Sequence, residues 1–247
     1  DEMGRPQPES VGRRNLAAAG ICAAQKPGRS RNPCSAENLG SAGEQAGQSR
    51  QHIVSSRREE TVKAIKFEEP WKVQCIDIEK PEPKEGQALI KVRAAGICGS
   101  DIGAFRGTNP LVSFPRIIGH EIVGEVLSIP EDNARGIKAG DRVIVDPYLY
   151  CTNCCTDLKV LGVHVEGGMA EYMTHPADML WKLPDDMPWD IAPMAEPLTI
   201  ALHGIHRGEL AAGEHVAIIG AGPIGLLAAM AALAYGAEPI VIDVVDE

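Results

Sequence analysis

Polar and apolar residues alternate along several short stretches of the chain after residue 60. A period of two is typical of strands with one buried face. The stretches are 61–67, 73–78, 88–94, 117–129 and 142–145. Prolines and a glycine between the second and third stretches mark a turn. We therefore expect a compact antiparallel β domain, with a loop carrying Cys98 directly after the third strand and His120 near the start of the fourth.

A helical period replaces this alternation near Ile191. From there to Ile205, apolar residues recur at intervals of three and four, which predicts a helix. Glu196 lies in this stretch directly before a proline, a position that disfavours helical backbone, so we expect it at a bend. Residues 185–188 are rich in turn formers and predict a domain boundary, with a first domain over 61–187 and a second over 188–247.

A glycine-rich turn gives the clearest local pattern. It reads Gly220-Ala221-Gly222-Pro223-Ile224-Gly225. An apolar strand (215–219) precedes it; an Ala/Leu-rich helix and a second strand (239–242) that runs into Asp243 follow it. These glycines would let a pyrophosphate reach the helix N-terminus, while Asp243 would bind the ribose hydroxyls, which favours NAD over NADP. The alternative is an ordinary β-α-β unit with a glycine-rich turn.

The overall composition argues against some classes of binding partner and favours one cellular compartment. A net charge of −10 over 247 residues argues against nucleic acid, which requires a basic surface. No apolar run reaches the roughly 18 residues needed to cross a bilayer, so we expect no membrane partner. Seven Cys, an odd number in no regular framework, favour reduced thiols and a cytoplasmic location.

The first 60 residues differ from the rest. They contain no Phe, Trp or Tyr and are rich in Gly, Ser, Arg and Gln. Such a segment cannot bury enough apolar surface to offset its ordering entropy, so we expect a disordered extension. The alternatives are a start site assigned too far upstream and an organelle-targeting peptide, against which Glu9, Glu37 and Glu44 argue.

Two separated clusters offer metal-binding atoms. Cys98 lies between two glycines, and His120 and Glu121 follow about 20 residues later. Thiolate sulfur, imidazole nitrogen and carboxylate oxygen are donors that zinc prefers, and ligands drawn from distant segments suit a catalytic ion with an open position. The alternative is a buried free cysteine beside a packed histidine.

A third cluster, Cys151, Cys154 and Cys155, suits a metal less well. Two of its thiols are adjacent, and a fourth donor for a closed tetrahedral site is missing. We expect a loop with reactive surface thiols instead.

Taken together, these segments resemble the zinc-dependent medium-chain dehydrogenases, in the branch that acts on alcohols, polyols and sugar acids. The matching segments are AAGICGSD (94–101), GHE (119–121), GDRV (140–143), GMAEY (168–172), EPL (196–198) and GAGPIG (220–225). The resemblance implies a GroES-like β domain followed by a Rossmann domain, with zinc and NAD as cofactors.

The resemblance also implies a role for each matched side chain. Cys98 and His120 match ligands of one catalytic zinc ion. Glu121 and Glu196 match carboxylates that bind the metal or its water. Ser100 matches the hydroxyl that relays the substrate proton, and Asp101 matches the carboxylate that orients the histidine.

The activity so implied is zinc-dependent transfer of a hydride from a secondary alcohol of a polyol or sugar acid to NAD. A zinc-free reductase is disfavoured, because Cys98, His120 and Glu196 are all present. The chain departs from the family pattern in two places. The lobe at 151–155 lacks the middle two ligands of a structural zinc, and the Rossmann domain stops after its second strand. The alternative function is therefore a catalytically inactive, truncated product that binds zinc or nucleotide weakly. A full-length form could be a homo-oligomer.

Overall fold

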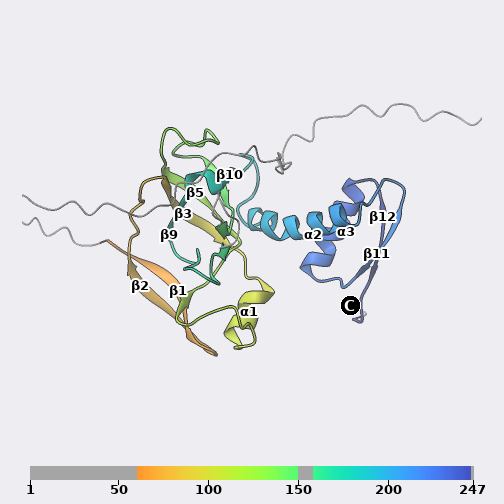
Figure 1. The fold of residues 1–247 in the computed structure, drawn as a ribbon, viewed down its shortest axis with the longest axis horizontal. Coiled ribbons are helices and arrows are strands. Elements are labelled where there is room, and N and C mark those ends of the chain that lie inside the picture. The colour runs from red at the N-terminus through yellow and green to blue at the C-terminus, as the bar shows by residue number, and fades with distance from the viewer. Residues whose placement is uncertain (1–59, 150–157, 246–247) are drawn as a thin grey trace, which may run out of the picture. The chain divides into compact units, whose positions relative to one another are not determined.

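A computed structural model describes residues 60–149 and 158–245, which form a β domain followed by an α/β segment (Figure 1). The predicted extension before residue 60 and the thiols of 151–155 lie outside the described residues. The strands are β1 (Thr61–Glu69), β2 (Lys72–Glu79), β3 (Gln87–Ala95), β4 (Arg116–Ile117), β5 (Ile122–Ser128), β6 (Arg142–Val145), β7 (Tyr148–Leu149), β8 (Lys159–Val160), β9 (Tyr172–Pro176), β10 (Leu180–Lys182), β11 (His215–Ile219) and β12 (Glu238–Ile242). The helices are α1 (Gly99–Phe105), α2 (Ala195–Arg207) and α3 (Pro223–Ala234), with 3-10 turns η1 (Ala177–Met179) and η2 (Ala192–Met194).

The β domain is antiparallel, as the alternation predicted. Its larger sheet has the strand order β10-β6-β5-β3-β9, and a smaller sheet has the order β2-β1-β4. Every second side chain of the central strands points into one apolar core. The core residues Ile90, Ile122, Val143 and Leu180 are completely buried. Strand β5 lies in the middle of this sheet, between β3 and β6. The residues directly before β5 are therefore attached to a rigid strand.

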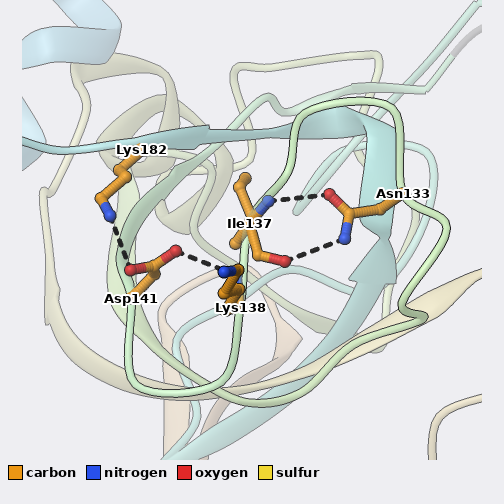
Figure 2. Close-up of polar contacts among 5 residues, drawn as sticks. All are labelled: Asn133, Ile137, Lys138, Asp141 and Lys182. Carbon is orange, nitrogen blue, oxygen red and sulfur yellow. Dashed lines mark hydrogen bonds and ion pairs between the residues drawn. The ribbon is translucent and has the colours of Figure 1, made fainter.

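A turn stabilised by side chains leads into β6 (Figure 2). The Asn133 amide accepts a hydrogen bond from the Ile137 N–H at 2.9 Å and donates one to the Ile137 carbonyl at 2.8 Å. Asp141 accepts hydrogen bonds from the Lys138 N–H at 2.9 Å and from Lys182 Nζ at 2.7 Å. These contacts fix the direction in which the chain enters β6.

Helix α1 was not anticipated, because only a loop was expected around Cys98. The helix begins directly after Cys98, and the Asp101 carboxylate accepts the Cys98 N–H at 2.9 Å, as the third residue of a capping box does. The Phe105 ring packs on Phe67 at a centroid distance of 5.7 Å and on Trp71 at 5.2 Å. Capping and aromatic packing together hold this seven-residue helix on the β domain.

The expected bend at Glu196 is wrong. Glu196 and Pro197 both lie in the first turn of α2, directly after η2. A proline is tolerated there, since the first N–H groups of a helix have no intrahelical acceptor. The boundary predicted near residue 187 stays a prediction, because Leu183 and Ala192, on either side of it, pack in one apolar cluster.

The α/β segment consists of β11, α3 and β12. The two strands are parallel, with Ala217 opposite Ile240. Their large apolar side chains remain exposed, and Ile219 keeps 88% of its accessible surface. No helix in the described parts of the chain is long and apolar enough to span a bilayer.

Candidate metal centre

Two segments of the β domain supply the three candidate ligands that lie closest together. Cys98 precedes α1, and His120 and Glu121 occupy the last two positions before β5. Gly119 directs the chain at this point with φ of +101°, and a Cβ there would lie 2.6 Å from Met169 Cγ. Only glycine tolerates both this backbone angle and the close approach of Met169. The backbone path of the GHE segment therefore depends on Gly119.

The donor atoms of Cys98, His120 and Glu121 converge. One sulfur, nitrogen or oxygen atom from each lies within 4.8 Å of the others. His120 and Glu121 are buried, and Cys98 is half-buried. A single cation could contact all three groups from one point.

Glu196 comes to this cluster from the opposite side of the predicted boundary. It is 6% exposed, and its charge acts on His120. The group within 4.8 Å does not include it. Glu196 therefore lies near the cluster but is not one of the three residues whose donor atoms converge.

Ser100 and Asp101 both contact the cluster from α1. Hydrogen bonds from Ser100 help to lower the pKa of the Cys98 thiol. The Asp101 Oδ1 atom lies 3.7 Å from His120 Nδ1, which is too far for a hydrogen bond, and Nδ1 is buried with no hydrogen-bond partner. Asp101 is thus placed beside the histidine while its carboxylate caps α1.

The electrostatics of the cluster couple a thiol to an imidazole. A hydrogen bond from His120 is the main cause that lowers the pKa of Cys98, although burial opposes it. Burial acts against the charge on His120, but Cys98, Asp101 and Glu196 outweigh it and raise the pKa of His120 to about 9. The cluster therefore favours a thiolate beside a charged imidazole.

Three carboxyl groups, those of Asp101, Glu121 and Glu196, lie near the thiol and the imidazole, and all three are buried. Burial raises the pKa of Asp101, and burial also raises the pKa of Glu121 and of Glu196. Buried charges are stable only when they are paired or bound to a metal. The convergent S, N and O donors fit a zinc ion, which would take the place of the hydrogen that Cys98 and His120 share.

One further residue shapes this site, and a second lies within its electrostatic reach; both were missed from the sequence. A Cβ on Gly96 would lie 1.9 Å from the Glu121 Oε2 atom, so the glycine makes room for that carboxylate. Burial raises the pKa of Tyr148, and so do the charges on Glu196, Asp146 and Cys98, which places the phenol within electrostatic reach of the cluster. The glycine before Cys98 was visible in the sequence, but no local pattern linked it to Glu121.

The glycine-rich turn forms a second candidate site. Gly220 has φ of +105°, and a Cβ on Gly225 would lie 1.8 Å from the Gly220 carbonyl oxygen. Gly222 is the N-cap residue directly before α3, and a Cβ there would meet nothing within 4 Å. Open space before a helix N-terminus fits the pyrophosphate of a dinucleotide.

Asp243 lies directly against this turn. Its carboxylate accepts hydrogen bonds from the N–H groups of Ala221, Val244 and Val245. Hydrogen bonds from Ala221, then Val245 and Val244, lower its pKa. The side chain is therefore held as an anion directly after β12, beside the glycine-rich turn.

Comparison with known proteins identifies relatives of about three quarters of this chain. The model of the "Alcohol dehydrogenase GroES-like domain" matches residues 84–185. An uncharacterized zinc-type alcohol dehydrogenase-like protein of Haemophilus influenzae is 53% identical over 198 residues, which are 76% of this chain and 58% of that protein. L-galactonate-5-dehydrogenase of Escherichia coli is 39% identical over 74% of this chain and 56% of that enzyme.

Solved structures agree in fold. A short chain alcohol dehydrogenase from Escherichia coli CFT073, complexed with NADH, superposes with a TM-score of 0.69 at 38% identity, over 75% of this chain and 58% of that one. Galactitol-1-phosphate dehydrogenase from Escherichia coli gives a TM-score of 0.68 at 30% identity, over 74% and 56%. The chain thus spans little more than half the length of these relatives.

Proposed function

Because this chain belongs to the zinc-type alcohol dehydrogenase family, we propose that it carries the metal site and the adenosine side of the cofactor site of an NAD-linked dehydrogenase. Its substrate would be a secondary alcohol of a polyol or sugar acid. The observation that carries the proposal is the convergence of Cys98, His120 and Glu121 within 4.8 Å.

In this proposal Cys98 and His120 hold the zinc ion, with Glu121 or Glu196 as a further carboxylate. Bound zinc would supply Lewis-acid activation of the substrate hydroxyl. Asp101, whose Oδ1 atom lies 3.7 Å from Nδ1, would orient the imidazole through its charge, as carboxylates beside metal-binding histidines do. Ser100 would relay the hydroxyl proton, as the family resemblance implies: its Oγ atom accepts that proton while its own hydroxyl hydrogen passes to solvent water.

The glycine-rich turn takes the dinucleotide in the same proposal. Gly220, Gly222, Pro223, Ile224 and Gly225 form the turn and the first residues of α3, where free N–H groups attract the pyrophosphate. Asp243 binds the ribose hydroxyls and repels a 2′-phosphate, which favours NAD. The dehydrogenase of known structure that binds NADH is consistent with this choice.

The test is zinc-dependent formation of NADH with a panel of polyols and sugar acids. We expect activity that is lost when zinc is removed, returns when zinc is restored, and is absent from the Cys98→Ser variant. Cys75→Ser is the matched control, because Cys75 is an exposed thiol on β2. Activity that survives zinc removal, or a protein that binds no zinc, would contradict the proposal.

A non-catalytic role is the second candidate, and the exposed apolar strands favour it. Ile219, Ile240 and Ile242 retain 88%, 52% and 49% of their accessible surface, which is unusual for parallel strands. In this role the chain binds zinc or nucleotide weakly, or associates with other subunits. Calorimetry with NAD separates the two candidates. Micromolar binding supports the dehydrogenase, and the absence of measurable binding supports the non-catalytic role.

A further inference from the structure

Arg142, the first residue of β6, holds the segment that leads into α2. Its guanidinium donates hydrogen bonds to the backbone carbonyls of Asp185 and Met187. The same group lies over the Trp189 ring, with Cζ 3.9 Å from the ring centroid. Its own carbonyl accepts the Leu183 N–H at 2.8 Å. One residue thus binds four points of the 183–189 segment.

This arrangement is unusual for a charged side chain. In the described part of the chain, the partners of the guanidinium are neutral carbonyls and an aromatic ring, and its Nε atom is buried with no hydrogen-bond partner. Partial burial of a cation without a carboxylate costs stability. Among the described residues, these contacts of the guanidinium all lie on the 183–189 segment.

The held segment continues directly into the metal centre. Ala192 of η2 is completely buried in a cluster with Val123 of β5 and Leu183. Two residues after η2, Glu196 lies in the first turn of α2, and its charge acts on His120. Because the cluster also contains β5, it joins the start of α2 to the strand that follows the GHE segment.

We propose that Arg142 is a positioning residue for the Glu196 carboxylate. By fixing the 183–189 segment on the β domain, it keeps the first turn of α2 beside His120, so that Glu196 can stabilise the bound metal. The inference rests on the proposed zinc site. Arg142 itself touches no candidate ligand, and it acts only through the path of the chain.

The experiment measures the affinity of the whole chain for cobalt(II), followed by the absorbance of its bond to a thiolate. Arg142→Lys keeps the charge but loses the planar fork that reaches two carbonyls and stacks on the ring. We expect about 10-fold weaker cobalt binding, the lower end of the effect of residues that orient ligands. In the Glu196→Gln background the same change should have no further effect, because the two residues act in one path.

Arg135→Lys is the matched control. Arg135 also stacks on a tryptophan, with Cζ 3.4 Å from the Trp181 centroid, and it donates to one backbone carbonyl, that of Asp178. The control therefore removes a similar set of contacts on the same domain without touching the path to α2. Thermal unfolding of both variants measures their structural cost, and we expect that cost to be similar.

The outcomes separate this inference from the zinc site itself. If the wild-type chain binds no cobalt, the proposed function fails, and the inference fails with it. If the wild type binds cobalt and Arg142→Lys binds it as well as Arg135→Lys does, the zinc site stands and the positioning role is overturned. An equal loss with and without Glu196 would also overturn it, because the effect would then not pass through that carboxylate.

Discussion

At the scale of single residues, Gly96 shows how a backbone position controls a distant side chain. Its N–H donates to the Glu121 carbonyl at 2.8 Å, and its missing side chain leaves the space that the Glu121 carboxylate fills. Gly96 therefore has two roles: its backbone bonds to the segment that carries Glu121, and its lack of a side chain leaves room for the Glu121 carboxylate. A methyl group there must displace the carboxylate or separate the two segments.

Gly96→Ala should weaken cobalt or zinc binding by about 10-fold, because Glu121 can no longer keep its place in the cluster. Gly99→Ala is the control, since a Cβ at Gly99 meets nothing within 4 Å. The measurement is metal affinity by competition with a chromogenic chelator. Equal affinities for the two variants would show that the position of Glu121 does not matter for the metal.

His175 should make the fold sensitive to mild acid. The imidazole is 1% exposed, and its Nε2 atom lies 2.9 Å from the Asp146 carbonyl. Burial lowers its pKa from 6.5 to about 4, although the contact with Asp146 opposes this. Between these values the unfolded chain binds more protons than the folded one. Stability that is present above pH 6.5 is therefore lost as the pH falls towards 4, by about 3 kcal/mol in all.

Denaturant unfolding between pH 4 and pH 7 checks this expectation. His175→Gln keeps a donor for the carbonyl but does not titrate, so its free energy of unfolding should change less steeply with pH than that of the wild type. Parallel curves for the two proteins would contradict the assignment of the slope to His175.

The candidate ligands were readable from the sequence because each stands in a short motif of distinctive donor types. Cys98, His120 and Glu121 are examples, and the structure places their donor atoms together. Gly96 and Tyr148 were not readable, because their relation to the site depends on contacts between segments far apart in the chain. The capping role of Asp101 did leave a signal, since Cys98 and Asp101 have the spacing of a capping box with cysteine in the place of serine.

At the scale of elements, strands were easier to predict than short helices. The alternation of residues 61–67 and 88–94 depends only on having one buried face, and both stretches became strands. Helix α1 has seven residues, too few for a helical period to stand out, and packing on Phe67 and Trp71 supports it. The first turn of α2 was misjudged at Pro197 for a related reason: the rule against proline weakens at a helix start.

Two glycines of the turn before α3 should respond differently to substitution. A Cβ on Gly225 would collide with the Gly220 carbonyl oxygen, whereas one on Gly222 faces open space. Gly225→Ala should therefore lower the free energy of unfolding of the β11-α3-β12 unit by about 1–3 kcal/mol. Gly222→Ala should leave it nearly unchanged and weaken any binding of NAD.

Hydrogen exchange of the amides in α3 and β12 measures the stability of this unit, and calorimetry measures the binding of NAD. Equal destabilisation of the unit by Gly222→Ala and Gly225→Ala would contradict the expected difference between the two glycines. Equal binding of NAD to the wild type and the Gly222 variant would also contradict it, because Gly222 would then not face the ligand.

At the scale of the whole molecule, the described residues form two candidate sites, which differ in how well the surrounding structure covers them. The metal centre has all of its candidate ligands within the β domain and the first turn of α2. The dinucleotide turn lies on a sheet of two strands with exposed apolar faces. The chain covers 58% and 56% of the two curated relatives described above.

In the proposed metal centre, sulfur, nitrogen and oxygen from Cys98, His120 and a neighbouring glutamate share one metal ion. X-ray absorption of the zinc-loaded chain tests it most directly. We expect one sulfur at about 2.3 Å and nitrogen or oxygen at about 2.0–2.1 Å, with no sulfur in the Cys98→Ser variant. A shell of several sulfurs, a sulfur that survives Cys98→Ser, or a chain that retains no zinc would contradict it.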